Sequence, residues 1–345
     1  MATTYAIPDG RVAMAATTYT GTGAAASISN AVNGVSMQPD LVWIKGRNNV
    51  TNNNLTDSVR GVTKLLFSNS TAAEATFSGG MSSFDSGGFS LASGGDTGFS
   101  ASGYTYVGWQ WKAGGAAVSN TAGSITSSVS ANTTAGFSVV TWTGTGANAT
   151  VGHGLGVAPS MVIARRRNGV SNWICWHSSF AGTQQILLND TGAVSTDATA
   201  WNSTVPSSTV ISVGNNGYTN ASTGLQVAYC FAPVAGYSAF GKYTGNGSAD
   251  GPFVYTGFRP RLVMIKRTDA AGSWKIHDTS RDLINPTGNT LYTQNSNAEA
   301  VADVFYDIVS NGFKLRDANG DHNASGGTYI YMAFAENPFK YANAR

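Results

Sequence analysis

The residues best suited to chemistry include a recurring aspartate–arginine pair. Asp57 lies three residues before Arg60, and Asp278 lies three residues before Arg281. A glycan-cleaving site needs two carboxylates that face each other across the bond to be cut, whereas each of these aspartates has an arginine as its neighbour in a predicted turn. An aspartate in a turn commonly accepts amide hydrogens and pairs locally. We therefore interpret both pairs as structural.

The four histidines and one acidic loop are the candidates for metal binding. No histidine spacing matches a zinc motif, and His177 and His277 occupy corresponding predicted strand ends, where a backbone hydrogen bond is the usual role. The loop DANGDHNASGG at 317–327 resembles a calcium loop, but Thr328 stands where the bidentate glutamate belongs. The sequence therefore predicts no catalytic residue, no metal site, no cofactor and no enzyme.

Tryptophans near predicted loop ends are the candidates for ligand binding. An exposed indole beside Asn, Asp and Ser groups can contact a sugar, whereas a buried indole contributes to a β-sheet core. The sequence leaves both interpretations open. The candidate glycan-contacting aromatics are Trp43, Trp173, Trp201 and Trp274.

An internal repeat determines which elements carry these residues. The segment PDLVWIKGRN at 39–48 reappears as PSMVIARRRN at 159–168 and PRLVMIKRTD at 260–269. An alternating segment closes each unit: TYVGWQW at 105–111, LQVAYCF at 225–231 and TYIYMAF at 328–334. Alternation with a period of two predicts strands, and a repeat of about 100 residues matches a complete β-sandwich.

The predicted fold is all-β, with three tandem antiparallel β-sandwich repeats that are jelly-roll-like and about 100 residues each. The expected division is an N-terminal arm at 1–16, repeats at 17–115, 136–235 and 236–345, and a polar linker at 116–135. The LVWIK-type strands are apolar on both faces, which predicts that both faces are covered. One face should meet the sandwich core, and the other a neighbouring unit or an overlying loop.

Basic residues end these strands, at Lys45, Arg165 and Lys266. Long basic side chains commonly lay their stems on apolar surface while the charge stays in water, and we expect that arrangement here. The two cysteines, Cys175 and Cys230, are too few for a disulfide framework. We expect buried, free thiols.

The overall composition limits the partners. Charged residues make up 11% of the 345 residues and the net charge is +2, so the sequence predicts no nucleic-acid partner. It contains no apolar run of the roughly 20 residues needed to span a bilayer, and its first residues do not have the pattern of a secretory signal. We therefore expect no membrane insertion.

Several long stretches resemble a known family. GFSVVTWTGTGANATVGHGLGVAPSMVIARRR, DSVRGVTKLLFSNSTAAEATF and NASGGTYIYMAFAENPF resemble a repeat domain of predicted virion proteins of tailed bacteriophages, many of them marine. The resemblance spans about residues 17–340. It implies a virion location, assembly in the host cytoplasm, and other tail or capsid proteins as partners. It assigns no functional residues.

Three functions are compatible with that resemblance. We favour a non-enzymatic surface protein of the tail fibre or spike type that recognises the host, with a host surface glycan or receptor as a further partner. A capsid decoration or head-fibre protein is the alternative, and a glycan depolymerase is a third.

The first 16 residues lie outside the repeat and are the candidate attachment arm. A free arm can become ordered by adding a strand to the exposed sheet edge of a partner. We expect such docking to bury Tyr5, Ile7 and Val12 against another virion protein.

Overall fold

The computed structural model describes residues 5–301 and 304–337 and is all-β with antiparallel sheets, which confirms the predicted fold class. In that part of the chain the only helical elements are a short 3₁₀ turn, η1 (Gly10–Val12), and a one-turn helix, α1 (Gly320–Asn323). No helix among the described residues has the length and apolar character needed to cross a membrane.

The first unit, formed by β1 to β9, consists of a six-stranded sheet and a three-stranded sheet. The large sheet has the order β1 (Met14–Thr20), β9 (Thr105–Trp111), β3 (Leu41–Gly46), β4 (Asn54–Asp57), β5 (Lys64–Phe67) and β6 (Ala75–Thr76). The small sheet has the order β2 (Ala26–Ser29), β8 (Gly88–Leu91) and β7 (Met81–Asp85). Tyr19 of β1 packs edge-on against Phe89 of β8, so the two sheets share a core.

The second unit, β10 to β19, has the largest sheet. Its order is β10 (Val118–Asn120), β11 (Ser127–Asn132), β12 (Phe137–Thr143), β19 (Leu225–Phe231), β14 (Met161–Arg166), β15 (Ile174–His177), β16 (Gln184–Leu187) and β17 (Ser195–Thr196). The small sheet pairs β13 (Ala149–Gly152) with β18 (Val210–Val213). The expected linker at 116–135 is therefore wrong, because it contains β10 and β11, which extend the large sheet beyond β12.

The third unit, β20 to β27, repeats the arrangement. Its large sheet has the order β20 (Ser238–Thr244), β27 (Thr328–Asn337), β22 (Arg259–Arg267), β23 (Lys275–Asp278) and β24 (Leu291–Tyr292). Its small sheet has the order β21 (Phe253–Tyr255), β26 (Gly312–Leu315) and β25 (Tyr306–Val309). Phe313 of β26 packs edge-on against Tyr331 of β27 and joins the two sheets.

The three LVWIK-type strands, β3, β14 and β22, occupy corresponding central places. Each lies between the closing strand of its unit and the next strand along the chain: β9-β3-β4, β19-β14-β15 and β27-β22-β23. Every residue of β3 is buried. Leu41 and Trp43 belong to the core shared between units, whereas Val42 and Ile44 belong to the core between the two sheets of the first unit. The prediction that both strand faces are covered is confirmed.

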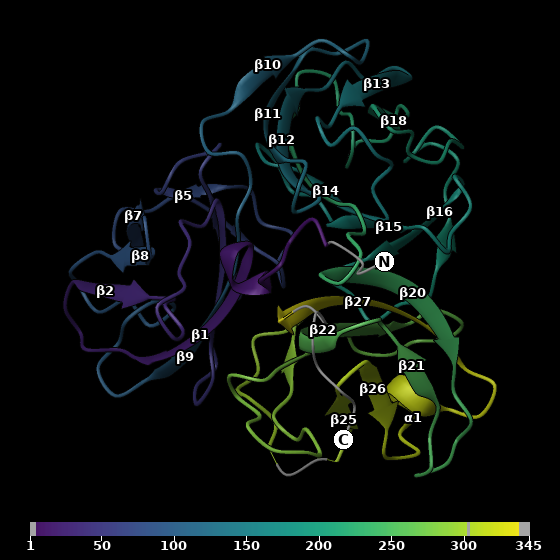
Figure 1. Cartoon of the computed structure of the whole chain (residues 1–345). Helices are drawn as coiled ribbons and strands as arrows, with labels where there is room; N and C mark the ends of the chain where they lie inside the picture. Colours follow the sequence, from purple (N-terminus) through teal and green to yellow (C-terminus); the bar gives the residue numbers. More distant parts are fainter. Residues whose placement is uncertain (1–4, 302–303, 338–345) are drawn as a thin grey trace.

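The three units form three lobes around a common centre (Figure 1). The last aromatic residue predicted for each closing strand lies at this centre: Trp111, Phe231 and Phe334. Their ring centroids are 6.0, 5.8 and 5.9 Å apart in the three pairings. Because each ring contacts both of the others, the units close into a pseudo-threefold ring and do not form a linear array.

The basic residues that end the central strands are fully buried, so the prediction that their charges reach water is wrong. Lys45 Nζ donates a hydrogen bond of 2.9 Å to the carbonyl of Ser296 in the third unit. Arg165 Nη2 donates to the carbonyl of Ala72 in the first unit, at 2.6 Å. Lys266 Nζ donates to a carbonyl of the second unit, at Gly192. Each unit thus places one cation against the backbone of the preceding unit around the ring.

Candidate functional site

The first aspartate–arginine pair lies inside the interface between units one and two. The side chains of Asp57 and Arg60 are fully buried, and Arg60 Nε lies 2.5 Å from Asp57 Oδ2. Tyr229, on the closing strand of unit two, donates its hydroxyl hydrogen to Asp57 Oδ2 at 2.8 Å. Arg60 also bonds Glu74, which in turn pairs with Arg167 of unit two at 2.8 Å. The prediction of a local structural pair is therefore correct but incomplete, because the pair also joins two units.

The second pair forms the same network between units three and one. Arg281 Nε lies 2.6 Å from Asp278 Oδ2, and both side chains are fully buried. Trp109 of unit one donates its indole hydrogen to the same aspartate oxygen at 2.9 Å. Arg281 also bonds Glu299, which pairs with Arg47 of unit one.

Between units two and three, every charged member of this network is replaced. Ser178 and Ala181 stand where the other units have aspartate and arginine. The amide of Val194 donates to the carbonyl of Thr268 at 3.0 Å. At the other two interfaces the equivalent bonds run from the amides of Glu74 and Glu299 to the carbonyls of Arg167 and Arg47. At this interface, which lacks the ion network, Val194 and Thr268 help to line a pocket of about 260 Å³. The substitutions thus occur as a set, which keeps any single charge from being buried alone.

The histidines are buried within this framework. Burial is the largest cause that lowers the pKa of both His177 and His277, in each case to about 4. His177 Nε2 lies 3.4 Å from the carbonyl of Tyr331, consistent with the predicted backbone hydrogen bond. For His277 that prediction is wrong, because its Nε2 lies 3.4 Å from the side-chain oxygen of Thr290. Within residues 5–301 and 304–337 there is no group of three or more His, Cys, Asp or Glu side chains placed to hold a metal. Cys175 and Cys230 are free and buried, and burial raises the pKa of both thiols.

The four candidate tryptophans are not glycan contacts, because all of them are at least 97% buried. Trp43 packs edge-on against Trp109. Trp173 and Trp274 each donate an indole hydrogen across an interface at 2.8 Å, to the carbonyls of Phe67 and Leu187. The fourth, Trp201, is also fully buried. Of the two open interpretations, packing in the core is the correct one for all four.

The N-terminal arm is not a free docking segment. Ile7 is 2% exposed in the core that the units share. The Tyr5 ring packs so closely on Gly236 of unit three that a Cβ there would lie 2.5 Å from a ring carbon. Arg261 of unit three donates to the carbonyl of Ala16 at 2.9 Å. Of the three predicted arm contacts, Val12 is 40% exposed and Tyr5 is partly exposed, and residues 1–4 lie outside the described residues.

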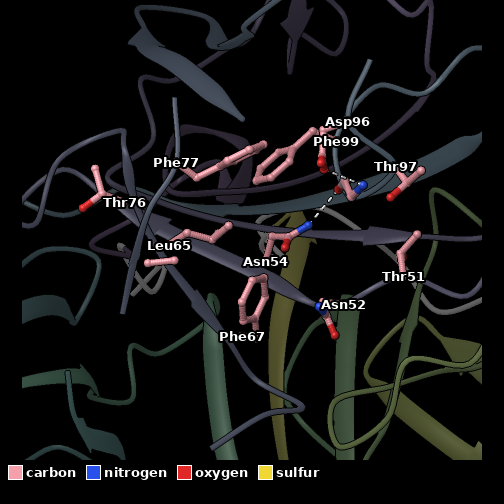
Figure 2. A pocket seen from close by; sticks show the side chains of 12 residues that line it. Thr51, Asn52, Asn54, Leu65, Phe67, Thr76, Phe77, Asp96, Thr97 and Phe99 are labelled. Carbon is pink, nitrogen blue, oxygen red and sulfur yellow. Dashed lines mark hydrogen bonds between the residues drawn. The ribbon is translucent and has the colours of Figure 1, made fainter. Parts of the chain in front are cut away.

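A pocket in unit one combines aromatic and polar side chains. It has a volume of about 280 Å³ and lies beside β4, β5 and β6, opposite the loop that contains Asp96 and Phe99 (Figure 2). Phe77 and Phe99 stack with ring centroids 6.1 Å apart. Phe67 and Leu65 belong to the same lining.

Three polar side chains of this pocket are fixed in place by their neighbours. Asn54, 98% buried, donates its amide hydrogen to the carbonyl of Gly98 at 2.7 Å. Asp96 accepts the Gly98 amide hydrogen through Oδ1 at 2.8 Å. Asn69 donates to Oδ1 of Asn52 at 2.9 Å, which leaves the Asn52 amide group free to donate. Among the described residues, Asn54 Oδ1 accepts no hydrogen bond although it belongs to a buried side chain.

The same place is built differently in the third unit. Sheet register aligns Asn54 with Lys275. Asn54 begins β4 and pairs with the last residue of β5, and Lys275 begins β23 and pairs with the last residue of β24. Equivalent turn hydrogen bonds align Phe99 with His322. In unit three these two residues contact each other, with Lys275 Nζ 3.2 Å from His322 Nδ1, and both pack on Phe305. Contacts between these residues take the place of an open pocket.

The sequence repeat gave no direct signal for this pocket, because its residues are those that differ between units. The available signal was indirect: Phe67, Phe77 and Phe99 are phenylalanines that the second unit lacks at the aligned positions 187, 197 and 219. A side chain found in only one copy of a repeat is not needed by the repeated fold, and so it becomes a candidate for a function of that copy.

Comparison with known proteins identifies the family. No curated protein and no solved structure matches the chain. A family model described as Domain of unknown function (DUF7483) matches residues 12–338, which is nearly the whole chain. The chain therefore belongs to the DUF7483 family.

Proposed function

We propose that this protein is a non-enzymatic structural component exposed on the surface of a bacteriophage particle, of the tail fibre or spike type that recognises the host. The observation that carries the proposal is the closed ring. Three units meet through a shared aromatic centre and through buried ion networks. Such a ring is a rigid platform that can present loops and pockets at its periphery to a host surface.

The use of the recurring carboxylates also supports a non-enzymatic role. Asp57 and Asp278 are fully buried. Each bonds an arginine of its own unit and an aromatic side chain of the next unit. Groups committed to such contacts are not free to take up and release protons at a substrate. The resemblance of the repeat to tailed-phage virion proteins is what directs the proposal to a phage particle.

The pseudo-threefold ring favours one second candidate, a capsid decoration or head-fibre protein. A partner surface with threefold symmetry can make three nearly equivalent contacts with such a ring, since matched symmetry lets one contact recur. Other virion proteins of the tail or capsid are the expected partners in either case.

Particle fractionation and labelling test both candidates. Particles of a phage that encodes this chain would be purified on a density gradient, analysed by mass spectrometry, and labelled with gold-conjugated antibody against the ring. Label on the tail supports the host-recognition proposal, and label on the head supports decoration. If the chain is absent from purified particles while a known capsid protein of the same preparation is detected, both candidates are wrong.

A further inference from the structure

We propose that the pocket of unit one binds a single neutral sugar ring, such as the terminal residue of a cell-surface glycan. The inference deepens the proposed host-recognition function and rests on it for its biological meaning. Its chemistry, however, rests on the pocket alone. In this pocket aromatic side chains, the amide groups of Asn52 and Asn54 and open space meet.

The apolar wall suits the carbon–hydrogen face of a sugar. Phe77 is half-buried and stacks on Phe99, which is 2% exposed, so the second ring holds the first in place. Leu65 and Phe67 continue the wall. Aromatic side chains contribute large contact area with little loss of conformational freedom on binding, and the buried partner ring removes part of the freedom that Phe77 would otherwise lose.

The polar wall suits hydroxyl groups. The Asn54 side chain is held by its bond to the Gly98 carbonyl, so its oxygen is fixed and ready to accept a hydrogen bond. The amide group of Asn52 is left as a donor, because Asn69 occupies its oxygen. Asp96 uses Oδ1 for the Gly98 amide, and its second oxygen can accept from a hydroxyl. Donors and acceptors fixed in this way are what a neutral polyol requires.

Charge and size narrow the ligand class. Asp96 is the only charged residue among those that line the pocket, so an anionic sugar would meet repulsion from the lining itself. A cation next to the lining, Lys64, already donates to Oγ1 of Thr76 at 2.8 Å. The volume of about 280 Å³ lies just below the roughly 300–1,000 Å³ of ordinary ligand sites. It therefore suits one sugar ring better than a longer chain bound end to end.

An apolar side chain of a partner protein is the competing occupant, and the polar wall disfavours it. Such a side chain would cover Asn54 Oδ1 and the free Asp96 oxygen without replacing their hydrogen bonds to water. A polar group that is covered and left without a partner loses its hydration, which weakens binding. A sugar ring covers the same aromatic face and supplies hydroxyls to both oxygens.

Saturation-transfer NMR on the full chain would test the inference. The probes are methyl glycosides of glucose, galactose, mannose, fucose and rhamnose, with N-acetylglucosamine, N-acetylneuraminic acid and N-acetylphenylalanine amide for comparison. We expect at least one neutral sugar to bind with a Kd in the millimolar range, as is reasonable for one ring. Binding of only the acidic sugar or only the phenylalanine amide would overturn the inference, as would no binding of any probe.

Two variants tie binding to this pocket. Phe77→Ala should weaken the affinity by about five- to tenfold, the size expected for loss of one aromatic contact. Phe84→Ala removes a similar half-buried phenyl from β7 outside the pocket and should leave the affinity unchanged. Equal binding by wild type and Phe77→Ala would show that the sugar binds elsewhere and would overturn the assignment.

A further variant uses the residue that the second unit carries at the corresponding strand position. Asn54→Ile removes the amide and should abolish binding, while far-UV circular dichroism checks that the sheet is retained. If this variant does not fold, the Phe77→Ala comparison decides. The sugar assay does not depend on where the protein sits in a particle, so failure here leaves the labelling experiment to decide the proposed function separately.

Discussion

Replacing Arg60 alone should destabilise the protein far more than replacing the entire ion network to which it belongs. The Arg60 side chain is fully buried and bonds Asp57, Glu74, the Leu55 carbonyl and the hydroxyl of Tyr229. Arg60→Ala would leave the Asp57 carboxylate buried beside an empty space. Removing one partner of a buried ion pair costs about 3–5 kcal/mol, and we expect a loss in that range.

The interface between units two and three, which lacks the ion network, supplies the comparison. A variant with five substitutions would give the interface between units one and two the residues found between units two and three. The substitutions are Asp57→Ser, Arg60→Ala, Glu74→Val, Arg167→Thr and Tyr229→Met. It leaves no charge buried without a partner and no tyrosine hydroxyl without its acceptor. Whole-network replacement by neutral residues is often close to neutral. Allowing for imperfect packing, we expect a loss of at most about 2 kcal/mol, clearly less than for Arg60→Ala.

Urea unfolding would measure both variants, followed by tryptophan fluorescence and circular dichroism with refolding verified, since large chains do not always unfold reversibly. Equal m-values would show that midpoint shifts report stability. Arg167→Ala is the matched control, because Glu74 keeps its bond to Arg60 and the loss should be about 1 kcal/mol. The reasoning is refuted if the five-residue variant is as unstable as Arg60→Ala, or if Arg60→Ala costs less than the control.

Three further outcomes are expected. Phe231→Ala should cost about 3–5 kcal/mol, because it empties the centre of the ring; calorimetry that finds one unit melting alone and the others unchanged would contradict a shared core. Since burial lowers the pKa of His177 and His277 from 6.5 to about 4, the unfolded chain binds more protons between these values. Stability should then fall as the pH drops from about 6.5 to about 4, by on the order of 3 kcal/mol per histidine, and His277→Gln should reduce that fall in unfolding experiments across this range. Ile7→Asp should destabilise the protein by several kcal/mol because it places a charge in the shared core; an unchanged melting temperature would restore the free-arm hypothesis.

The central strands were predictable because their signal is local. An uninterrupted apolar run such as β3 must be covered on both faces wherever it lies, so its place in the middle of a sheet follows from the sequence. Strands β10 and β11 carry no such signal, since Val118 and Ser119 are exposed at a sheet edge and two of the three buried residues of β11, Ser127 and Ser130, are serines. Their sequence is that of a polar linker, and pairing with β12 decides the outcome.

The errors about Lys45, Arg165 and Lys266 have a different physical origin. A basic side chain at a strand end can reach water or a ring of carbonyl groups, and the sequence around it is the same in both cases. The carbonyls that receive these cations belong to another unit. The position of these carbonyls depends on how the three units close into a ring. The apolar central strands indicated that both of their faces are covered, but not which unit covers them. The buried Trp173 and Trp274 follow the same logic, because the carbonyls that accept their indole hydrogens lie across an interface.

One chain with three related units can do what a trimer of identical chains cannot. In a symmetric trimer every interface carries the same residues, so the neutral set around Val194 and Thr268 would have to appear three times or not at all. Here two interfaces keep the ion network and the third has lost it as a unit. The same freedom lets positions 54 and 99 hold asparagine and phenylalanine around an open pocket in unit one, while unit three closes that place with Lys275 and His322. Because these positions are not the ones that carry the ion networks, the residues of the pocket can change without breaking those networks.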